Sequence, residues 1–413
     1  MDRQYPNIYL AADNCFAKKR WPAPREWAGV IADLGVRYVE ASADTELDPF
    51  YMGEAYLRDW PHAVQEAQAA TGVRVCNLYS GHGSYTTLGL THFDPRVRRH
   101  MIDRWFKPLV ETAAALGAGF GFYAHAFSES ILADPDRYAA HCGYLLDALT
   151  ELNEYAEQLG CGPLCLEQMY SPNQVPWTIS GTASLLREVT RRSGRPFYFT
   201  EDLGHHHDRF LMPSREALRE AFRDPETDIW LGSQEAYDRF DAARVAGELS
   251  DAACDEILDL MRQAPRYFES REDTDCYAWL RALGCYSPII HLQQTEGRSS
   301  AHCPFTPEQN RRGKIRGRAV LEALKESYDR PDQAGMPPRC EKIYLTFELF
   351  AGTSQTTRSI LKEYAQSVRY WRQFIPQDGL PLDELLRRLP EEETELEEQP
   401  VLHFQPVSTA QGL

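Results

Sequence analysis

The sequence predicts an α/β fold, a (β/α)8 TIM barrel, from two observations. Short apolar runs alternate with helix-like segments along almost the whole chain, and each of eight such runs is followed by helical material. Within the runs the apolar character is nearly continuous, as expected for parallel strands that helices cover. The eight predicted strands are Ile8–Ala12, Arg37–Ala41, Val73–Tyr79, Gly119–Ala124, Pro163–Glu167, Pro196–Thr200, Ser287–Leu292 and Lys342–Phe347.

The helices between these strands are predicted from apolar periodicity and from glycines that end them. Gly35, Gly117 and Gly160 each follow a leucine at the end of a periodic segment, which is a common helix stop. The predicted barrel helices are Pro24–Leu34, Leu57–Ala70, Pro95–Leu116, Asp136–Leu159, Ala183–Arg192, Arg316–Ser327 and Thr356–Arg372.

A doubly wound sheet is the competing architecture. Such a sheet favours a glycine-rich turn that leaves the first strand and opens a helix. The glycine-rich run 117–121 enters a strand instead of leaving one. This context favours the barrel.

Two segments depart from the regular alternation. About 206–283 carries extra helices near 214–222, 235–246 and 251–263, and we interpret it as a helical insertion beside the barrel mouth that partly roofs the pocket. The barrel, with this insertion, is predicted to span 1–374. The C-terminal extension 375–413 includes Glu391–Glu398, six glutamates in eight residues, and is predicted to be acidic and partly flexible.

Composition excludes several classes of protein. The 413 residues carry 61 acidic and 44 basic side chains, a net charge of −17, which disfavours nucleic-acid binding. No apolar run approaches the ~20 residues of a membrane-spanning helix, and the N-terminus lacks the pattern of a signal peptide. Ten scattered cysteines without a paired framework indicate reduced thiols. We therefore expect a cytoplasmic enzyme with no membrane partner, and a homo-oligomer is compatible with the sequence.

Ionisable side chains stand at the ends of four consecutive predicted strands. In a TIM barrel these ends meet at one rim, where active sites lie. Three carboxylates in one pocket repel one another unless a cation sits among them, and three oxygens with one nitrogen suit Mn, Mg, Co or Zn. The sequence therefore predicts one divalent metal ion per chain. The four predicted ligands are Glu167, Asp202, His291 and Glu348.

Other histidines are candidates for the same pocket. His205 follows Asp202 by three residues and is predicted to face the pocket, whereas His206 and His207 are predicted to be exposed, because three successive side chains cannot all point at one site. His82 and His125, near the ends of the third and fourth strands, suit a substrate-facing role or simple loop packing equally.

The strand-end series, together with several longer stretches, resembles the sugar phosphate isomerase/epimerase group of xylose isomerase-like TIM barrels, nearest to the erythrulose-phosphate and ketose 3-epimerases. The resemblance covers roughly 7–372. The stretches that carry it are 13–21 (DNCFAKKRW), 91–95 (THFDP), 286–295 (YSPIIHLQQT) and 304–306 (PFT).

The resemblance implies roles for individual residues. It implies that the four strand-end residues bind the metal and that Glu167 and Glu348 also exchange the proton. It further implies that His205 and Arg298 contact the substrate. Asn173 or Gln174 stands where many relatives carry another glutamate, which argues against the familiar hexulose substrates.

The expected reaction is epimerisation of a ketose or ketose phosphate at C3. One glutamate removes the proton beside the carbonyl, the cation stabilises the enediolate, and the other glutamate returns a proton to the opposite face. Cations are needed for a phosphate, and the candidates are Lys18, Lys19, Arg20 and Arg298.

Four alternatives stay open. The same ligands allow aldose–ketose isomerisation, and the same scaffold allows decarboxylation or dehydration of an oxidised sugar. A metallo-endonuclease for damaged DNA needs more histidines and a basic face. A non-enzymatic sugar-binding barrel needs neither of the two catalytic glutamates.

Overall fold

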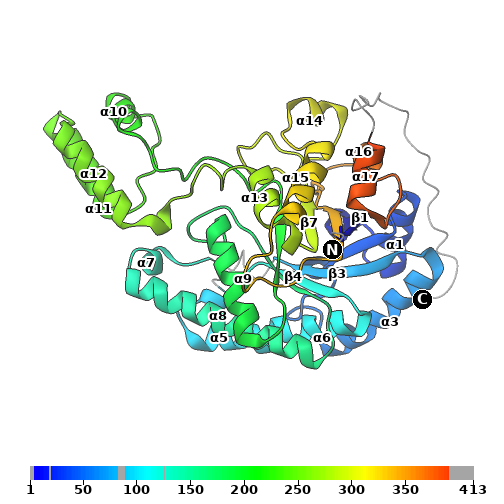
Figure 1. Ribbon diagram of the computed structural model, residues 1–413. Helices are drawn as coiled ribbons and strands as arrows, with labels where there is room; N and C mark the ends of the chain where they lie inside the picture. Colours follow the sequence, from blue (N-terminus) through cyan, green and yellow to red (C-terminus); the bar gives the residue numbers. More distant parts are fainter. Residues whose placement is uncertain (1–3, 18–19, 82–88, 125, 390–413) are drawn as a thin grey trace.

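The predicted eight-stranded barrel is present in the computed structural model, which describes residues 4–17, 20–81, 89–124 and 126–389 (Figure 1). All eight strands are parallel to their neighbours, and β1 pairs with both β8 and β2, so the sheet closes. The strands are β1 (Asn7–Asp13), β2 (Tyr38–Ser42), β3 (Arg74–Ser80), β4 (Gly119–Phe122), β5 (Leu164–Glu167), β6 (Tyr198–Asp202), β7 (Ile289–Leu292) and β8 (Lys342–Phe347). The predicted (β/α)8 fold is confirmed, and each strand begins and ends within two residues of its predicted bounds.

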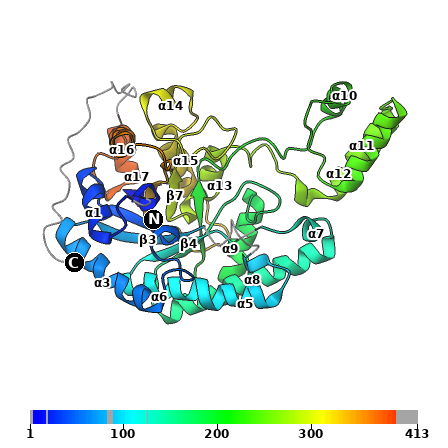
Figure 2. The same cartoon turned by 180° about the vertical axis from the view of Figure 1, so that it is seen from behind.

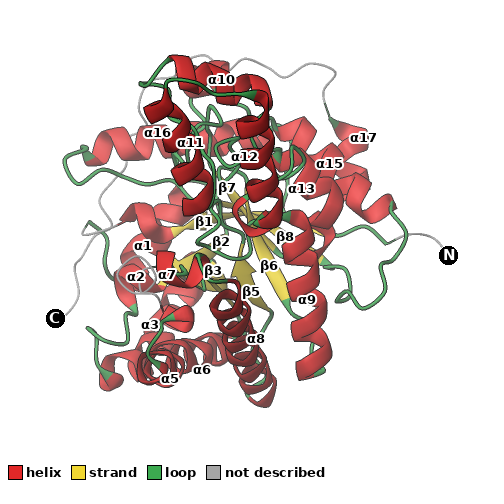
Figure 3. Ribbon diagram, turned by 90° about the vertical axis from the view of Figure 1, so that its left-hand side faces the viewer, coloured by secondary structure: helices red, strands yellow, loops and turns green. Residues whose placement is uncertain are grey.

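Helices surround the strands on the outside of the barrel (Figure 3). The larger ones are α1 (Pro24–Asp33), α3 (Glu54–Thr71), α5 (Pro95–Met101), α6 (Lys107–Leu116), α8 (Pro135–Gln158), α9 (Ile179–Ser193), α13 (Cys276–Leu283), α15 (Gly317–Asp329) and α16 (Thr357–Arg372). Short helices α2 (Ala43–Glu46), α7 (Glu129–Leu132) and α14 (Pro307–Arg312) lie in the connections. The single helix predicted over Pro95–Leu116 is interrupted by a π-helical turn, Ile102–Phe106. Pro108, just after that turn, lacks the N–H that a regular helix needs there.

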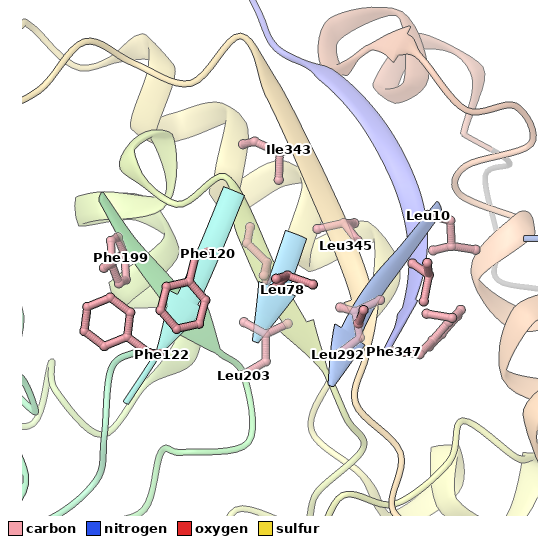
Figure 4. Close-up of a cluster of buried hydrophobic side chains, with 14 of the residues drawn as sticks. Leu10, Leu78, Phe120, Phe122, Phe199, Leu203, Leu292, Ile343, Leu345 and Phe347 are labelled. Atoms are coloured by element: carbon pink, nitrogen blue, oxygen red, sulfur yellow. The ribbon is translucent and has the colours of Figure 1, made fainter. Parts of the chain in front are cut away.

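The core lies largely between the strands and the surrounding helices. Side chains alternate along a strand, so each strand sends large apolar residues toward the helices and other residues toward the barrel axis. Figure 4 shows apolar side chains of β1, β3, β4, β6, β7 and β8, with Leu203 just after β6. Asp202 and His291 occupy the alternate positions beside such residues, and both are fully buried. The pattern that builds the core therefore also turns these two ionisable residues toward the axis.

The insertion between β6 and β7 forms a helical arm. Helices α10 (Arg215–Arg223), α11 (Gln234–Ala246) and α12 (Asp251–Gln263) share a small apolar core of their own that includes Leu218 and Phe240. The arm stands away from the barrel (Figures 1 and 2). The expected helices are present, but they extend outward from the barrel, whereas the sequence predicts that they roof part of the pocket.

The C-terminal part of the described chain packs on the barrel. A two-residue strand β9 (Leu380–Pro381) pairs antiparallel with β1, and α17 (Leu382–Arg388) buries two leucines in the main core. The described portion of the predicted extension is therefore integrated with the barrel, and the acidic run Glu391–Glu398 lies outside the described residues.

Among the described helices, none combines the length and the apolar character that a membrane crossing requires.

Glu46, near the barrel mouth, makes stability depend on pH. Its buried carboxyl accepts hydrogen bonds from Asn14 Nδ2 (2.8 Å) and Trp60 Nε1 (3.0 Å), and burial raises its pKa to about 8. Between about pH 4.5 and 8 the folded state keeps a proton that the unfolded state has released, so stability falls as pH rises through this window. We expect wild type to lose stability relative to Glu46→Gln across it, on the order of 4 kcal/mol at most. Urea unfolding of both proteins at pH 5 and pH 8 checks this, and parallel pH profiles would contradict it.

Candidate metal centre and active site

The structure brings together the four strand-end residues that the sequence singled out. In the β6–β7 register Asp202 lies directly opposite His291, and β5 and β8 flank this pair. One ligand atom from each residue lies within 4.8 Å of every other, and all four residues are buried. They are Glu167 at the end of β5, Asp202 at the end of β6, His291 in β7 and Glu348 directly after β8.

The orientation of His291 suits a metal ligand. Its Nε2 lies 2.9 Å from Oε2 of Glu40 on β2, which leaves Nδ1 to face the carboxylates. Nδ1 lies 3.3 Å from Glu167 Oε1 and 3.4 Å from Glu348 Oε2. Among the described residues, neither this Nδ1 nor Glu348 Oε2 has a hydrogen-bond partner, although both are buried. A carboxylate thus fixes the far nitrogen of this histidine, and two potential metal-ligand atoms without hydrogen bonds face each other. This arrangement fits a divalent cation.

The electrostatics of the cluster also call for a cation. Burial lowers the pKa of His291, but the charges of Glu348 and Glu40 outweigh it and hold that pKa well above its ordinary value. Burial raises the pKa of Glu348, yet His291 and His302 together bring it well below its ordinary value. The carboxylates and these histidines thus favour each other's charged forms, which compensates part of the negative charge. A divalent cation among the same oxygens would take over this compensation.

A cavity opens beside the cluster. None of the described residues that line it comes from the insertion, so the expected partial roof over the pocket is not supported. Its lining consists of Asp13, Cys15, Ser42, Asp44, Tyr79, Gly81, Glu167, His205, His302, Glu348 and Phe350.

Two lining residues that sequence reasoning missed contact the glutamates directly. The Tyr79 hydroxyl donates a hydrogen bond to Glu167 Oε2, and the ring of Tyr79 stands edge-on to His291. His302 Nδ1 lies 3.3 Å from Glu348 Oε2. Tyr79 ends a predicted strand, so its position was a usable signal, whereas His302 lies in a loop that no periodicity singles out.

Of the predicted substrate contacts, His205 is at the site. It lines the cavity, its Nε2 lies 3.3 Å from Asp202 Oδ2, and its Nδ1 lies 2.8 Å from the main-chain oxygen of Gln168. Tyr170 packs edge-on against its ring, with 4.6 Å between ring centroids.

The basic side chains predicted to bind a phosphate do not lie in the metal-ligand cluster where the structure describes them. Arg298 is exposed on the loop after β7 and does not line the cavity. The guanidinium of Arg20 donates to the main-chain oxygens of Gly352 (3.2 Å) and Gln355 (2.7 Å), in the loop after β8. Lys18 and Lys19, as well as His82 and His125, lie outside the described residues.

The two residues at the expected position of a further glutamate hold the local loops together. Asn173 Nδ2 donates to the main-chain oxygen of Phe127, and Gln174 Nε2 donates to the hydroxyl of Tyr123. Neither residue lines the cavity.

The prediction that His206 is exposed is wrong. His206 is buried, and its Nε2 lies 3.0 Å from Glu201 Oε1. Glu201 precedes Asp202, so strand alternation turns its carboxylate away from the barrel axis into the surrounding core, where a charge needs a partner. Burial lowers the pKa of His206, but Glu201 raises it above its ordinary value. His207 is half-buried, not exposed, and contacts Tyr170 and Phe210.

The chain is similar in sequence to known proteins. A family described as xylose isomerase-like TIM barrel matches residues 29–230. D-erythrulose 1-phosphate 3-epimerase of Brucella abortus (strain 2308) is 24% identical over 322 residues, which cover 77% of this chain and 79% of that protein. The resemblance to the ketose 3-epimerases is thereby confirmed.

Solved structures share the fold. A protein of Rhodospirillum rubrum ATCC 11170 named for xylose isomerase superposes with a TM-score of 0.62 at 19% identity, over 88% of this chain and 98% of its own. D-allulose 3-epimerase from Methylomonas sp. gives a TM-score of 0.51 at 13% identity, over 90% of this chain and 99% of its own. The chain therefore has the (β/α)8 TIM-barrel fold and is similar to xylose isomerase-like TIM barrels over residues 29–230.

Proposed function

We propose that this protein is a divalent-metal-dependent epimerase that inverts C3 of a ketose or ketose phosphate. The observation that carries the proposal is the buried cluster in which two glutamates, Glu167 and Glu348, flank one histidine. The similarity to a D-erythrulose 1-phosphate 3-epimerase supports the same reaction.

Glu167, Asp202, His291 and Glu348 would hold the cation. Three carboxylate oxygens and one imidazole nitrogen favour Mn or Mg, since carboxylate-rich sites suit these hard ions. When bound, the cation would polarise the ketose carbonyl and offset the negative charge that develops as the neighbouring carbon loses its proton.

The two glutamates divide the proton transfer. One removes the proton from C3, and the other delivers a proton to the opposite face, which inverts that carbon. Tyr79 fixes Glu167 by donating to Oε2, so Oε1 is the oxygen that faces His291. Glu348 comes from the end of β8, three strands farther round the barrel than β5. Two bases from separate strands suit inversion better than a proton shuttled along one face.

Turnover in deuterated water tests the reaction. Purified protein with Mn²⁺ is given pairs of C3-epimeric ketoses and their phosphates, and the products are followed by NMR. We expect conversion of one epimer into the other with one solvent deuteron at C3. Product without solvent deuterium, or with a new aldehyde carbon, would contradict C3 epimerisation and favour aldose–ketose isomerisation. Release of CO2 from an oxidised sugar would favour decarboxylation.

His205 and Arg298 are proposed to contact the substrate. Their variants distinguish contacts to the sugar from contacts to a phosphate group. We expect His205→Ala to lower kcat/KM for every substrate while one Mn²⁺ per chain is retained, because all four proposed ligands are left in place. We expect Arg298→Ala to lower kcat/KM for a ketose phosphate more than for the free ketose, since only the phosphate needs a cation. Metal analysis and steady-state kinetics check both. Loss of the metal in either variant would show that the ligand set is assigned wrongly. Lys18, Arg20 and His82 remain proposed substrate contacts.

A further inference from the structure

The loop after β7 begins with a buried amide that holds one of the proposed ligands. Gln293 Nε2 donates to both carboxylate oxygens of Asp202, at 2.9 Å each. Gly204 makes room for this amide, because a Cβ at that position would lie 2.1 Å from Gln293 Cδ. Asp202 is thus oriented by a group that carries no charge and cannot titrate.

The same amide also fixes His302. Gln293 Oε1 accepts a hydrogen bond from the His302 main-chain N–H at 2.6 Å. His302 has a φ of +45°, the one positive value among the described non-glycine residues, and this conformation is costly for an L residue. Ser300 Oγ lies 3.1 Å from Gln293 Nε2 and 3.0 Å from His302 Nε2. The strained backbone therefore coincides with the point where three polar groups meet.

His302 in turn reaches Glu348. Its Nδ1 hydrogen-bonds to the main-chain oxygen of Glu348 at 3.3 Å and lies 3.3 Å from Oε2 of the same residue. Its ring stacks on Phe350, with 3.8 Å between centroids and 9° between planes. The imidazole is thus held on one face by an aromatic ring and on its far nitrogen by a hydroxyl.

The loop that carries these groups is tied down at its base. Gln294 pairs with Cys303 across the loop, and its side-chain amide donates to the main-chain oxygen of Ile315 and accepts from the N–H of the same residue. Such anchoring limits the freedom of the loop, so the side chains it presents keep one geometry.

We propose that Gln293, Ser300 and His302 form a positioning network that fixes Asp202 and Glu348 relative to each other. The inference rests on the proposed function, since it takes these two residues as ligands of the cation. Without the network, the two carboxylates would repel each other and turn apart. With it, the ligands would already be in place for a cation, and Glu348 would keep the direction that proton transfer requires.

Metal affinity without substrate tests the Asp202 side of the network. We expect Gln293→Leu to weaken Mn²⁺ binding about 10–100-fold, as removal of a group that orients a ligand typically does. Ser300→Ala should weaken Mn²⁺ binding by a smaller factor. Because this variant removes only a hydroxyl, it still tests the network if Gln293→Leu does not fold. Ser299→Ala, an exposed hydroxyl in the same loop, is the matched control and should bind like wild type. Titration with Mn²⁺, followed by the electron paramagnetic resonance signal of the free ion, measures all four proteins.

Kinetics test the Glu348 side. His302→Phe keeps the stacking on Phe350 but loses the donor, and we expect kcat to fall about 10–100-fold with little change in KM. His302→Gln keeps an N–H donor and should recover much of that loss. If His302→Phe retains the kcat of wild type, or His302→Gln is as slow as His302→Phe, His302 does not position Glu348.

The two proposals fail in different ways. Equal Mn²⁺ affinity of Gln293→Leu, Ser300→Ala and Ser299→Ala would overturn the network, whatever the reaction is. Wild type that binds Mn²⁺ and epimerises no ketose would overturn the proposed function, while the Mn²⁺ titrations would still decide whether the network orients Asp202.

Discussion

Glu167→Gln and Glu348→Gln should each lower kcat by more than about 10⁴-fold. Loss of a general base alone typically costs ~10²–10⁴-fold, and each of these residues would also neutralise the cation. Glutamine keeps the shape and one ligating oxygen but removes the basic carboxylate, so the effect isolates the charge. Glu341→Gln is a matched control, because it makes the same change at an exposed position beside the opposite end of β8.

Isotope exchange separates the two glutamates from each other. If they serve opposite faces, one variant should still exchange the C3 hydrogen of one epimer with solvent while inverting nothing, and the other variant should do so for the other epimer. Steady-state kinetics and NMR in deuterated water measure both quantities. Inversion at the wild-type rate in either variant would refute the two-base assignment.

Removal of the metal should abolish activity and lower the melting temperature, and Mn²⁺ or Mg²⁺ should restore both. A cation that binds the folded state stabilises it by about 2.7 kcal/mol at 100 times its Kd. Asp202→Ala should lose this metal-dependent rise, while Glu341→Gln should keep it. Calorimetry with and without a chelator makes the comparison. Full turnover by protein shown to be metal-free would contradict the proposal.

Acid should release the metal, and the pKa shifts within the cluster give the direction of this pH dependence. Charge from Glu348 and Glu40 holds the pKa of His291 well above its ordinary value despite burial, so a proton competes with the cation for Nδ1. Burial raises the pKa of Asp202, so a proton also competes with the cation for this carboxylate. Falling pH therefore weakens Mn²⁺ binding, and the apparent affinity should rise steadily from acid to neutral pH.

The four proposed ligands could be found in the sequence because a barrel has a simple rule. Each strand ends at the same rim, so Glu167 and Glu348 had to approach each other once the strands were recognised. The helices of the insertion were equally accessible, since periodicity and serine caps are local signals. Ser214 and Ser250, for example, cap α10 and α12 through their hydroxyls.

Other features depend on contacts between distant parts of the chain. Glu40 meets His291 across 251 positions of sequence, and Tyr79 meets Glu167 across 88. His206 is buried because Glu201 lies on the outer face of β6 and needs a partner there. The direction of the helical arm also depends on packing at its base, where Arg266 donates to the main-chain oxygen of Leu132.

The sequence by itself determined the barrel, the order of its elements and the residue types at the strand ends, because apolar periodicity and strand polarity are properties of neighbouring residues. Only the tertiary structure decided how those residues are oriented. His291 Nδ1 is left for a ligand because Glu40 occupies Nε2, and Asp202 is held by Gln293 only because Gly204 leaves space for the amide. Orientation depends on which hydrogen-bond partners a buried polar group finds, and in a closed barrel those partners come from strands and loops far away in the chain.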